Sequence, residues 1–222
     1  MSLETLHPFW VSQAVTLLTA LALVCAFALL AVRTTNLCVR VYAAQSLLLG
    51  LAGVLLSLRG HATALGVGIL AIVMKGFLIP WFLFRVMEDM DIRREAEPFV
   101  PPALSLFMGV GLALLAYGAF KPLTADGSAA GRGFAMSLTL MLLGLWLMAA
   151  RRKAITQVVG ILVVENGLFV AAISTSFHLP LIVELGLAFD LLVAVVVIGL
   201  LVFRIRDTFV TIDTERLNRL KG

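Results

Sequence analysis

Hydrophobic residues in this chain fall into long runs that are separated by short polar breaks. Seven runs can be drawn, at about 9–32, 37–58, 62–86, 101–120, 133–150, 153–176 and 181–204. Each run is close to the ~20 residues that a helix needs to cross the hydrocarbon of a bilayer. The runs are uninterrupted and lack the alternation of a transmembrane β-barrel strand. The pattern therefore predicts an all-α integral membrane protein with about seven transmembrane helices.

The composition supports the same class. The chain has 222 residues, of which 61% are hydrophobic and 14% are charged, and its mean hydropathy is +1.07. Soluble domains are about half apolar and about a quarter charged. The net charge of +4 could indicate nucleic-acid binding, but most basic residues lie in short loops beside apolar runs. Membrane topology explains them better, and we expect no nucleic-acid partner.

The distribution of Lys and Arg predicts an orientation. If the N-terminus faces outward, 13 basic residues lie on the cytoplasmic side and 3 on the outer side. This excess matches the positive-inside rule and places the C-terminus in the cytoplasm. It also supports an odd number of helices.

Loop lengths divide the chain into three regions. A four-helix N-terminal region, 1–130, precedes a compact three-helix region, 131–206, and a cytoplasmic tail, 207–222. The turn "RRK" at 151–153 is very tight, so helices five and six should form an antiparallel hairpin. The outer break "SFHLP" at 176–180 is almost as short and keeps helix seven beside helix six.

A few charged side chains remain at membrane depth once the loops are set aside. Lys75 lies about 13 residues into its run, Glu165 about 12 and Asp190 about 10. At about 1.5 Å per residue, the three fall within a few ångströms of one depth. An ionised side chain at mid-helix costs roughly 2.5–3.5 kcal/mol on insertion scales, so such groups should face inward.

Buried charges of this kind have two interpretations. They can form a proton path, because a row of ionisable groups at one depth is what a relay requires. They can equally form a static ion pair between Lys75 and either Glu165 or Asp190 that fixes helix packing. From the residues alone, both interpretations stand.

Other polar residues are candidates for supporting roles. Glu184 lies one turn from the outer surface and is expected to be interfacial. Gln45, Gln157 and Asn166 are expected to make hydrogen bonds between helices or to hold water. His178 lies at the outer rim, where it is solvated or serves as a point of proton entry.

Pro80 follows Lys75 in "MKGFLIP". A proline removes a backbone donor and frees a carbonyl in the preceding turn, near Gly76. We expect a kink beside the buried lysine, which would suit a water-lined break in the helix.

Motifs for cofactors or metals are not found. The sequence has no HExxH, P-loop or CxxCH, and Cys25 and Cys38 lack the spacing of a cluster or zinc site. We therefore expect no catalytic residues, cofactor or metal in this chain.

Two stretches carry a family resemblance. The segments "RRKAITQVVGILVVENGLF" and "VELGLAFDLLVAVVVIGLLVFRI" resemble the C-terminal part of hydrogenase-4 component E. "YAAQSLLL", "KGFLIP" and "LNRLKG" are similar to other parts of that family. The last three helices also resemble the K subunit of complex I, whose middle and last helices each carry a glutamate of the proton path. By this resemblance Asp190 takes the last-helix position, and Glu165 lies nearly one turn from the middle-helix position.

The resemblance implies a membrane-arm subunit of a group 4 [NiFe]-hydrogenase or formate-hydrogenlyase-like complex. Its partners would be antiporter-like and complex I-like membrane subunits and a peripheral hydrogenase or related redox arm. Its location would be the bacterial or archaeal cytoplasmic (inner) membrane, crossed several times. A subunit of a multisubunit cation/proton antiporter and a purely structural scaffold are the alternatives.

Overall fold

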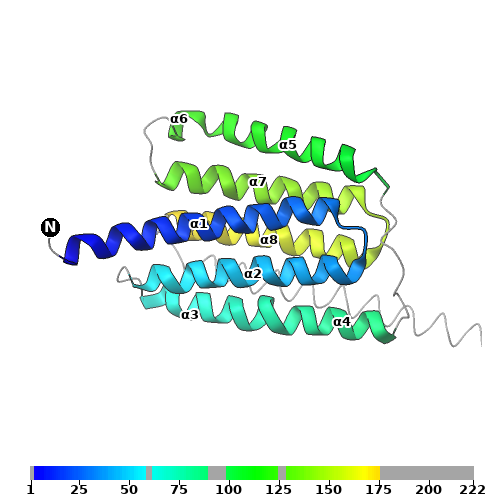
Figure 1. Cartoon of the computed structure of the whole chain (residues 1–222), viewed down its shortest axis with the longest axis horizontal. Helices are drawn as coiled ribbons and strands as arrows, with labels where there is room; N and C mark the ends of the chain where they lie inside the picture. The colour runs from blue at the N-terminus through cyan, green and yellow to red at the C-terminus, as the bar shows by residue number, and fades with distance from the viewer. Residues whose placement is uncertain (1–2, 59–61, 90–98, 125–128, 176–222) are drawn as a thin grey trace, which may run out of the picture.

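The computed structural model describes residues 3–58, 62–89, 99–124 and 129–175. These residues contain helices and no β-strand. The elements are α1 (Leu3–Ala31), α2 (Thr35–Ser57), α3 (Ala62–Ala71), the π-helix η1 (Ile72–Leu78), α4 (Ile79–Asp89), α5 (Pro102–Ala119), α6 (Lys121–Thr124), α7 (Ala129–Ala150) and α8 (Ala154–Thr175). They lie side by side as one bundle of nearly parallel and antiparallel rods (Figure 1).

Six described helices are long and apolar enough to cross a membrane. They span Trp10–Ala31, Thr35–Ser57, Leu65–Glu88, Pro102–Ala119, Gly131–Ala150 and Ala154–Ser174. These bounds match the first six predicted runs to within a few residues. The chain is therefore a multi-pass membrane protein. The seventh predicted span, 181–204, and the tail lie outside the described residues.

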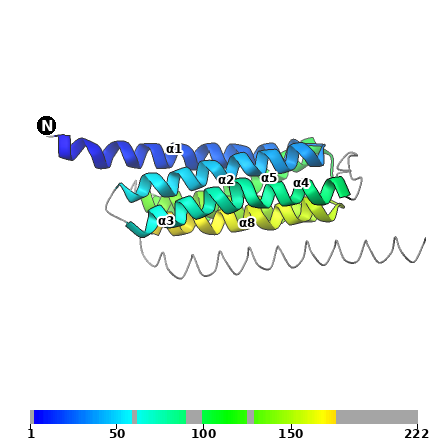
Figure 2. The same cartoon turned by 90° about the horizontal axis from the view of Figure 1, so that it is seen from below.

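The helix α8 occupies the centre of the described bundle. It packs most extensively against α7 and also contacts α2, while α2 in turn contacts α1, α3 and η1 (Figures 1 and 2). The span of α8 is 67% buried, whereas the span of α5 is only 17% buried. Outer helices instead present apolar side chains such as Phe107 and Leu114, which are 75% and 70% exposed. Such surfaces suit hydrocarbon.

Glycines allow α7 and α8 to pack at short range. A Cβ added to Gly144 would lie 2.7 Å from the carbonyl oxygen of Gly160 and 2.7 Å from the backbone nitrogen of Val164. On the opposite helix, a Cβ on Gly160 would lie 2.4 Å from Cγ of Met148. Small residues are how membrane helices bring their backbones together, because burial against lipid tails supplies no hydrophobic drive. The predicted hairpin of helices five and six is present as α7 and α8.

The turn between α7 and α8 is fastened to the end of α1 by Arg151. Its side chain is 4% exposed, and Nη2 donates to the carbonyl oxygens of Leu29, Leu30 and Val32 at 3.1, 3.2 and 2.6 Å. The last carbonyls of a helix have no partner within the helix, and a cation there also complements the helix dipole. Burial lowers the pKa of Arg151, and the nearby Cys38 opposes that shift. Arg151 therefore serves as a buried C-terminal cap.

Replacing Arg151 with alanine should destabilise the fold strongly. Three carbonyls would lose a charged donor, and a hydrogen bond to a charged group contributes about 1.5–3 kcal/mol. We expect a loss of roughly 2–4 kcal/mol in the free energy of unfolding, measured by denaturant titration in bicelles. The neighbouring Arg152 is exposed and lies 4.8 Å over the ring of Phe99. Arg152→Ala is the matched control, with an expected loss of about 0.5–1 kcal/mol. Equal effects of the two variants would refute the capping role.

Candidate functional site: a buried ion pair beside an amide cluster

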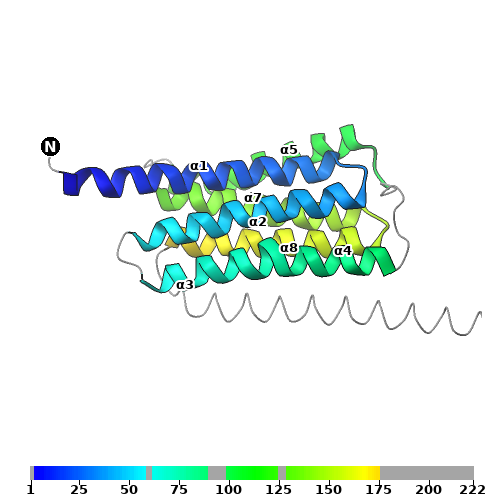
Figure 3. The ribbon, with the colours of Figure 1, turned by 60° about the horizontal axis from the view of Figure 1, so that its bottom comes forward.

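The third crossing changes its helical geometry in the middle of the membrane. The span Leu65–Glu88 is built from α3, η1 and α4, which lie end to end (Figure 3). In the wide η1 turns the N–H of Ile79 donates to the carbonyl oxygen of Met74, five residues earlier. Pro80 follows at once and has no N–H to donate. The turns before Pro80 therefore form a π-helix, which often marks functional sites.

Close packing against α2 holds η1 in place. A Cβ added to Gly76 would lie 2.5 Å from Cδ2 of Leu47 on α2. The glycine therefore lets the two helices approach, and the adjacent Lys75 is held with them inside the bundle. Lys75 is 7% exposed although its residue type is among the least often buried.

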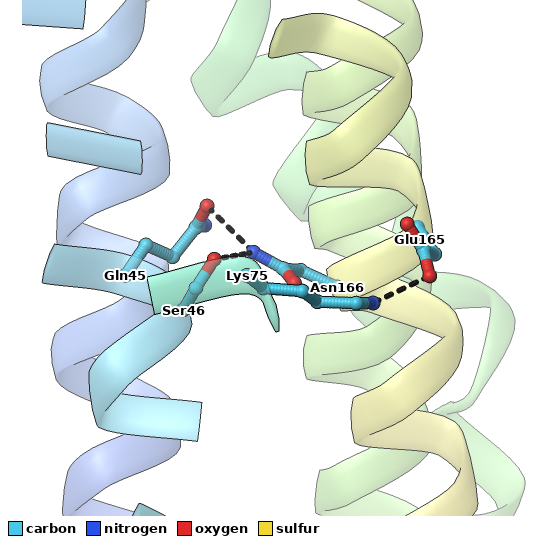
Figure 4. A network of polar contacts seen from close by, with 5 residues as sticks. All are labelled: Gln45, Ser46, Lys75, Glu165 and Asn166. Carbon is cyan, nitrogen blue, oxygen red and sulfur yellow. Dashed lines mark hydrogen bonds and ion pairs between the residues drawn. The ribbon is translucent and has the colours of Figure 1, made fainter. Parts of the chain in front are cut away.

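Lys75 forms an ion pair with Glu165 across the bundle. Nζ lies 2.6 Å from Oε1 of Glu165, whose side chain is 1% exposed (Figure 4). Charges removed from water are strongly disfavoured unless they are paired, and here each group supplies the opposite charge that the other requires. The shared depth predicted for these two residues is confirmed. Of the two partners that the sequence allowed for Lys75, Glu165 makes this contact, and Asp190 lies outside the described residues.

An uncharged cluster lies beside the ion pair. The amide nitrogen of Asn166 donates to Oε1 of Gln45 and to Oγ of Ser46, both at 3.2 Å (Figure 4). Gln45 then donates through Nε2 to the carbonyl oxygen of Ala22 at 3.1 Å. These contacts join α8, α2 and α1, so the interhelical roles predicted for Gln45 and Asn166 are confirmed.

The central position of α8 explains how the consecutive residues Glu165 and Asn166 take part in the ion pair and in the amide cluster respectively. Consecutive residues of a helix point about 100° apart, so Glu165 and Asn166 face different neighbours. Glu165 faces η1, and Asn166 faces α2. An acid and an amide side by side are what a central helix requires when both of these neighbours carry polar groups.

Other predicted site residues lie elsewhere. Gln157 is exposed, and its amide donates to the carbonyl oxygen of Arg151 at 2.9 Å. This bond closes the turn before its own helix, where the sequence had predicted a hydrogen bond between helices. The remaining candidates, His178, Glu184 and Asp190, lie outside the described residues.

Sequence reasoning missed Ser46 and the role of Arg151. Ser46 is 0% exposed and accepts a bond from Asn166; its only signal in the sequence is its place next to Gln45 in an apolar run. Among the described residues, no group of three or more His, Cys, Asp or Glu side chains could hold a metal ion. Within the described ranges, the site offers one buried ammonium, one buried carboxylate and neutral hydrogen-bonding groups.

The chain is similar in sequence to known proteins. It is 33% identical to the uncharacterized protein Rv0085 of Mycobacterium tuberculosis over 186 residues, which cover 82% of this chain and 84% of the relative. The chain belongs to the same family as Rv0085. It is also 27% identical to hydrogenase-4 component E of Escherichia coli (strain K12) over 154 residues, 68% of this chain and 71% of that protein.

The Shigella flexneri hydrogenase-4 component E has the same identity and coverage. The resemblance noted in the sequence to this component is thereby supported as a distant homology. No model of a known protein family matches the chain. No solved structure matches it either.

Proposed function

We propose that this protein is a non-catalytic membrane-arm subunit of a group 4 [NiFe]-hydrogenase-like, complex I-related complex. In this proposal Lys75, Glu165 and Asp190 form part of its ion-translocation path. The observation that carries the proposal is the buried Lys75–Glu165 pair in mid-span, with Lys75 on a π-helix, in a distant homologue of hydrogenase-4 component E. The location proposed is the bacterial or archaeal inner membrane, with the N-terminus outside.

The physical support comes from the free-energy cost of burying two charged side chains in the bundle. A purely structural bundle gains little from a buried pair, because well-packed apolar residues of similar volume are often as stabilising or more so. Ionisable groups held inside a membrane are rare, and they mark ion pathways and proton relays. Glu165 would carry the proton, while Lys75 would tune it or carry one itself.

Asp190 completes the proposed path. It lies at a similar depth in the predicted seventh span. The three-helix region 131–206 would then act as the counterpart of the K subunit of complex I, with Glu165 and Asp190 as successive carriers. Each charge moved against about 100 mV requires about 2.3 kcal/mol, which partner subunits must supply. The partners proposed are antiporter-like and complex I-like membrane subunits and a peripheral hydrogenase or related redox arm.

Neutral carboxamide substitutions test the path. We expect Asp190→Asn, and Glu165→Gln combined with Lys75→Met so that no charge is left unpaired, to leave the complex assembled while proton uptake into inverted vesicles, driven by the redox arm, falls at least tenfold. The reason is that an amide cannot accept and release a proton as a carboxylate does. Assembly is measured by co-purification and uptake by the quenching of a pH-sensitive dye. Gln157→Leu, at the exposed turn, is the control and should leave both unchanged.

The outcomes separate this function from its alternatives. Normal uptake in both variants would show that neither acid is on the path. Failure of these variants to assemble would favour a scaffold, because neither leaves Lys75 with an unpaired buried charge. The proteins that co-purify with the native chain separate the remaining class: antiporter subunits without a hydrogenase-type large subunit would favour the cation/proton antiporter.

A further inference from the structure

Several described oxygens at or near the ion pair already have donors. Oε1 of Glu165 contacts the ammonium of Lys75 at 2.6 Å. In the neighbouring cluster, Oε1 of Gln45 and Oγ of Ser46 both accept from Asn166. The carbonyl oxygen of Ala22 accepts from Gln45. Oxygen atoms such as these are the ligands that a bare cation would need at this depth.

We propose that this site handles protons and excludes alkali-metal cations, because the ammonium of Lys75 occupies the place at Glu165 that Na⁺ would take. The inference rests on the proposed function, in which the pair lies on an ion path. It goes further by giving Lys75 a selective role, the exclusion of alkali-metal cations.

Coordination chemistry gives the first reason. A hard cation that leaves water must replace its hydration shell with several protein oxygens. The 2.6 Å contact leaves no room for an ion between Nζ and Oε1. Displacing the lysine would also leave its own charge buried without a partner, at a cost of several kcal/mol.

A proton needs neither ligands nor space. Along the Nζ···Oε1 contact the N–H bond breaks and an O–H bond forms, so that the ammonium becomes an amine and the carboxylate becomes a carboxylic acid. The step moves one proton, conserves the total charge and requires no oxidant or reductant. Its product is a neutral pair, which a low-dielectric interior tolerates better than two separated charges.

Sodium binding to the purified chain tests the proposal. The melting temperature of the detergent-solubilised protein is measured at alkaline pH in high NaCl and in equal choline chloride. We expect wild type to show no difference. Lys75→Ala removes the ammonium and opens space beside the carboxylate, so we expect NaCl to raise its melting temperature by about 3 °C or more over choline chloride.

Two further variants test whether the Na⁺ response depends on the missing cation and on the carboxylate. Lys75→Arg keeps a cation at the site and should be indifferent to Na⁺. Glu165→Gln in the Lys75→Ala background should abolish the response, because the anionic oxygen is gone. A Na⁺ response in wild type that Glu165→Gln removes would overturn the proposal, as would a Lys75→Ala protein without any response. The readout is binding, so it stands apart from whether Glu165→Gln impairs translocation.

Discussion

Replacing Lys75 with methionine, or Glu165 with leucine, is expected to destabilise the protein far more than replacing both together. The two groups are 7% and 1% exposed and in contact at 2.6 Å. Either single substitution leaves an uncompensated charge inside the bundle, which costs about 3–5 kcal/mol. The double variant removes both charges and keeps similar volumes, so it should be within about 1–2 kcal/mol of wild type or more stable.

A double-mutant cycle on the free energy of unfolding, measured by denaturant titration in bicelles, reads this coupling directly. Independent residues give additive losses, whereas this pair should show a coupling of at least about 2–3 kcal/mol. Losses that simply add would show that the contact contributes nothing to the fold. Matched substitutions at Arg40 and Gln157, which are both exposed, provide an additive control.

The same double variant separates the two interpretations of the buried charges. If the pair is only a packing device, a stable double variant should assemble and translocate normally. If the pair carries protons, the variant should assemble with translocation lost, because methionine and leucine cannot ionise. A folded protein without translocation is the result expected from the proposed function.

Replacing Gly144 with alanine is expected to disrupt the contact between α7 and α8. The added Cβ would lie 2.7 Å from the carbonyl oxygen of Gly160 and 2.7 Å from the backbone nitrogen of Val164. Overpacking of a core typically costs about 1–3 kcal/mol and sometimes more. Both obstacles here are backbone atoms that no rotamer change can move, so we expect a loss of at least about 3 kcal/mol in the free energy of unfolding.

Gly111 on α5 offers a matched control. A Cβ there would meet no heavy atom within 4 Å. Gly111→Ala should be neutral or stabilising by up to about 1 kcal/mol, since alanine favours a helix more than glycine does. Both variants are compared in the same unfolding assay. A similar response at the two positions would mean that α7 and α8 do not pack as closely as the structure shows.

The displacement of α8 by Gly144→Ala should also change the position of Glu165 in its contact with Lys75. Glu165 follows Val164, the residue whose backbone the new methyl group would press against. We therefore expect the coupling between Lys75 and Glu165 to weaken in this background. Coupling that is unchanged would show that the ion pair is held by η1 and α2 alone.

Much of this arrangement can be predicted from the sequence. Every backbone polar group inside hydrocarbon must be bonded within its own helix, so each crossing is recognised from its own apolar run. Six predicted crossings are confirmed for that reason. Depth also follows from counting along a run, which is why Lys75 and Glu165 were expected at one level before their contact was known.

Tertiary structure alone decided which groups meet. Depth along a helix follows from the spacing of residues, but the direction in which a side chain points depends on how the helices rotate and which of them are neighbours. Lys75 therefore had two possible partners, and Ser46 had no visible role, until η1 and α2 were placed against α8.

Arg151 illustrates the same limit at the end of the bundle. Its place in a short basic turn indicated only a charge on the cytoplasmic side. Its burial against the last carbonyls of α1 depends on the packing of helices that are more than a hundred residues apart in the chain. Local sequence determined the crossings and their polar residues, and the close approach of helices through glycine determined which of those residues became a site.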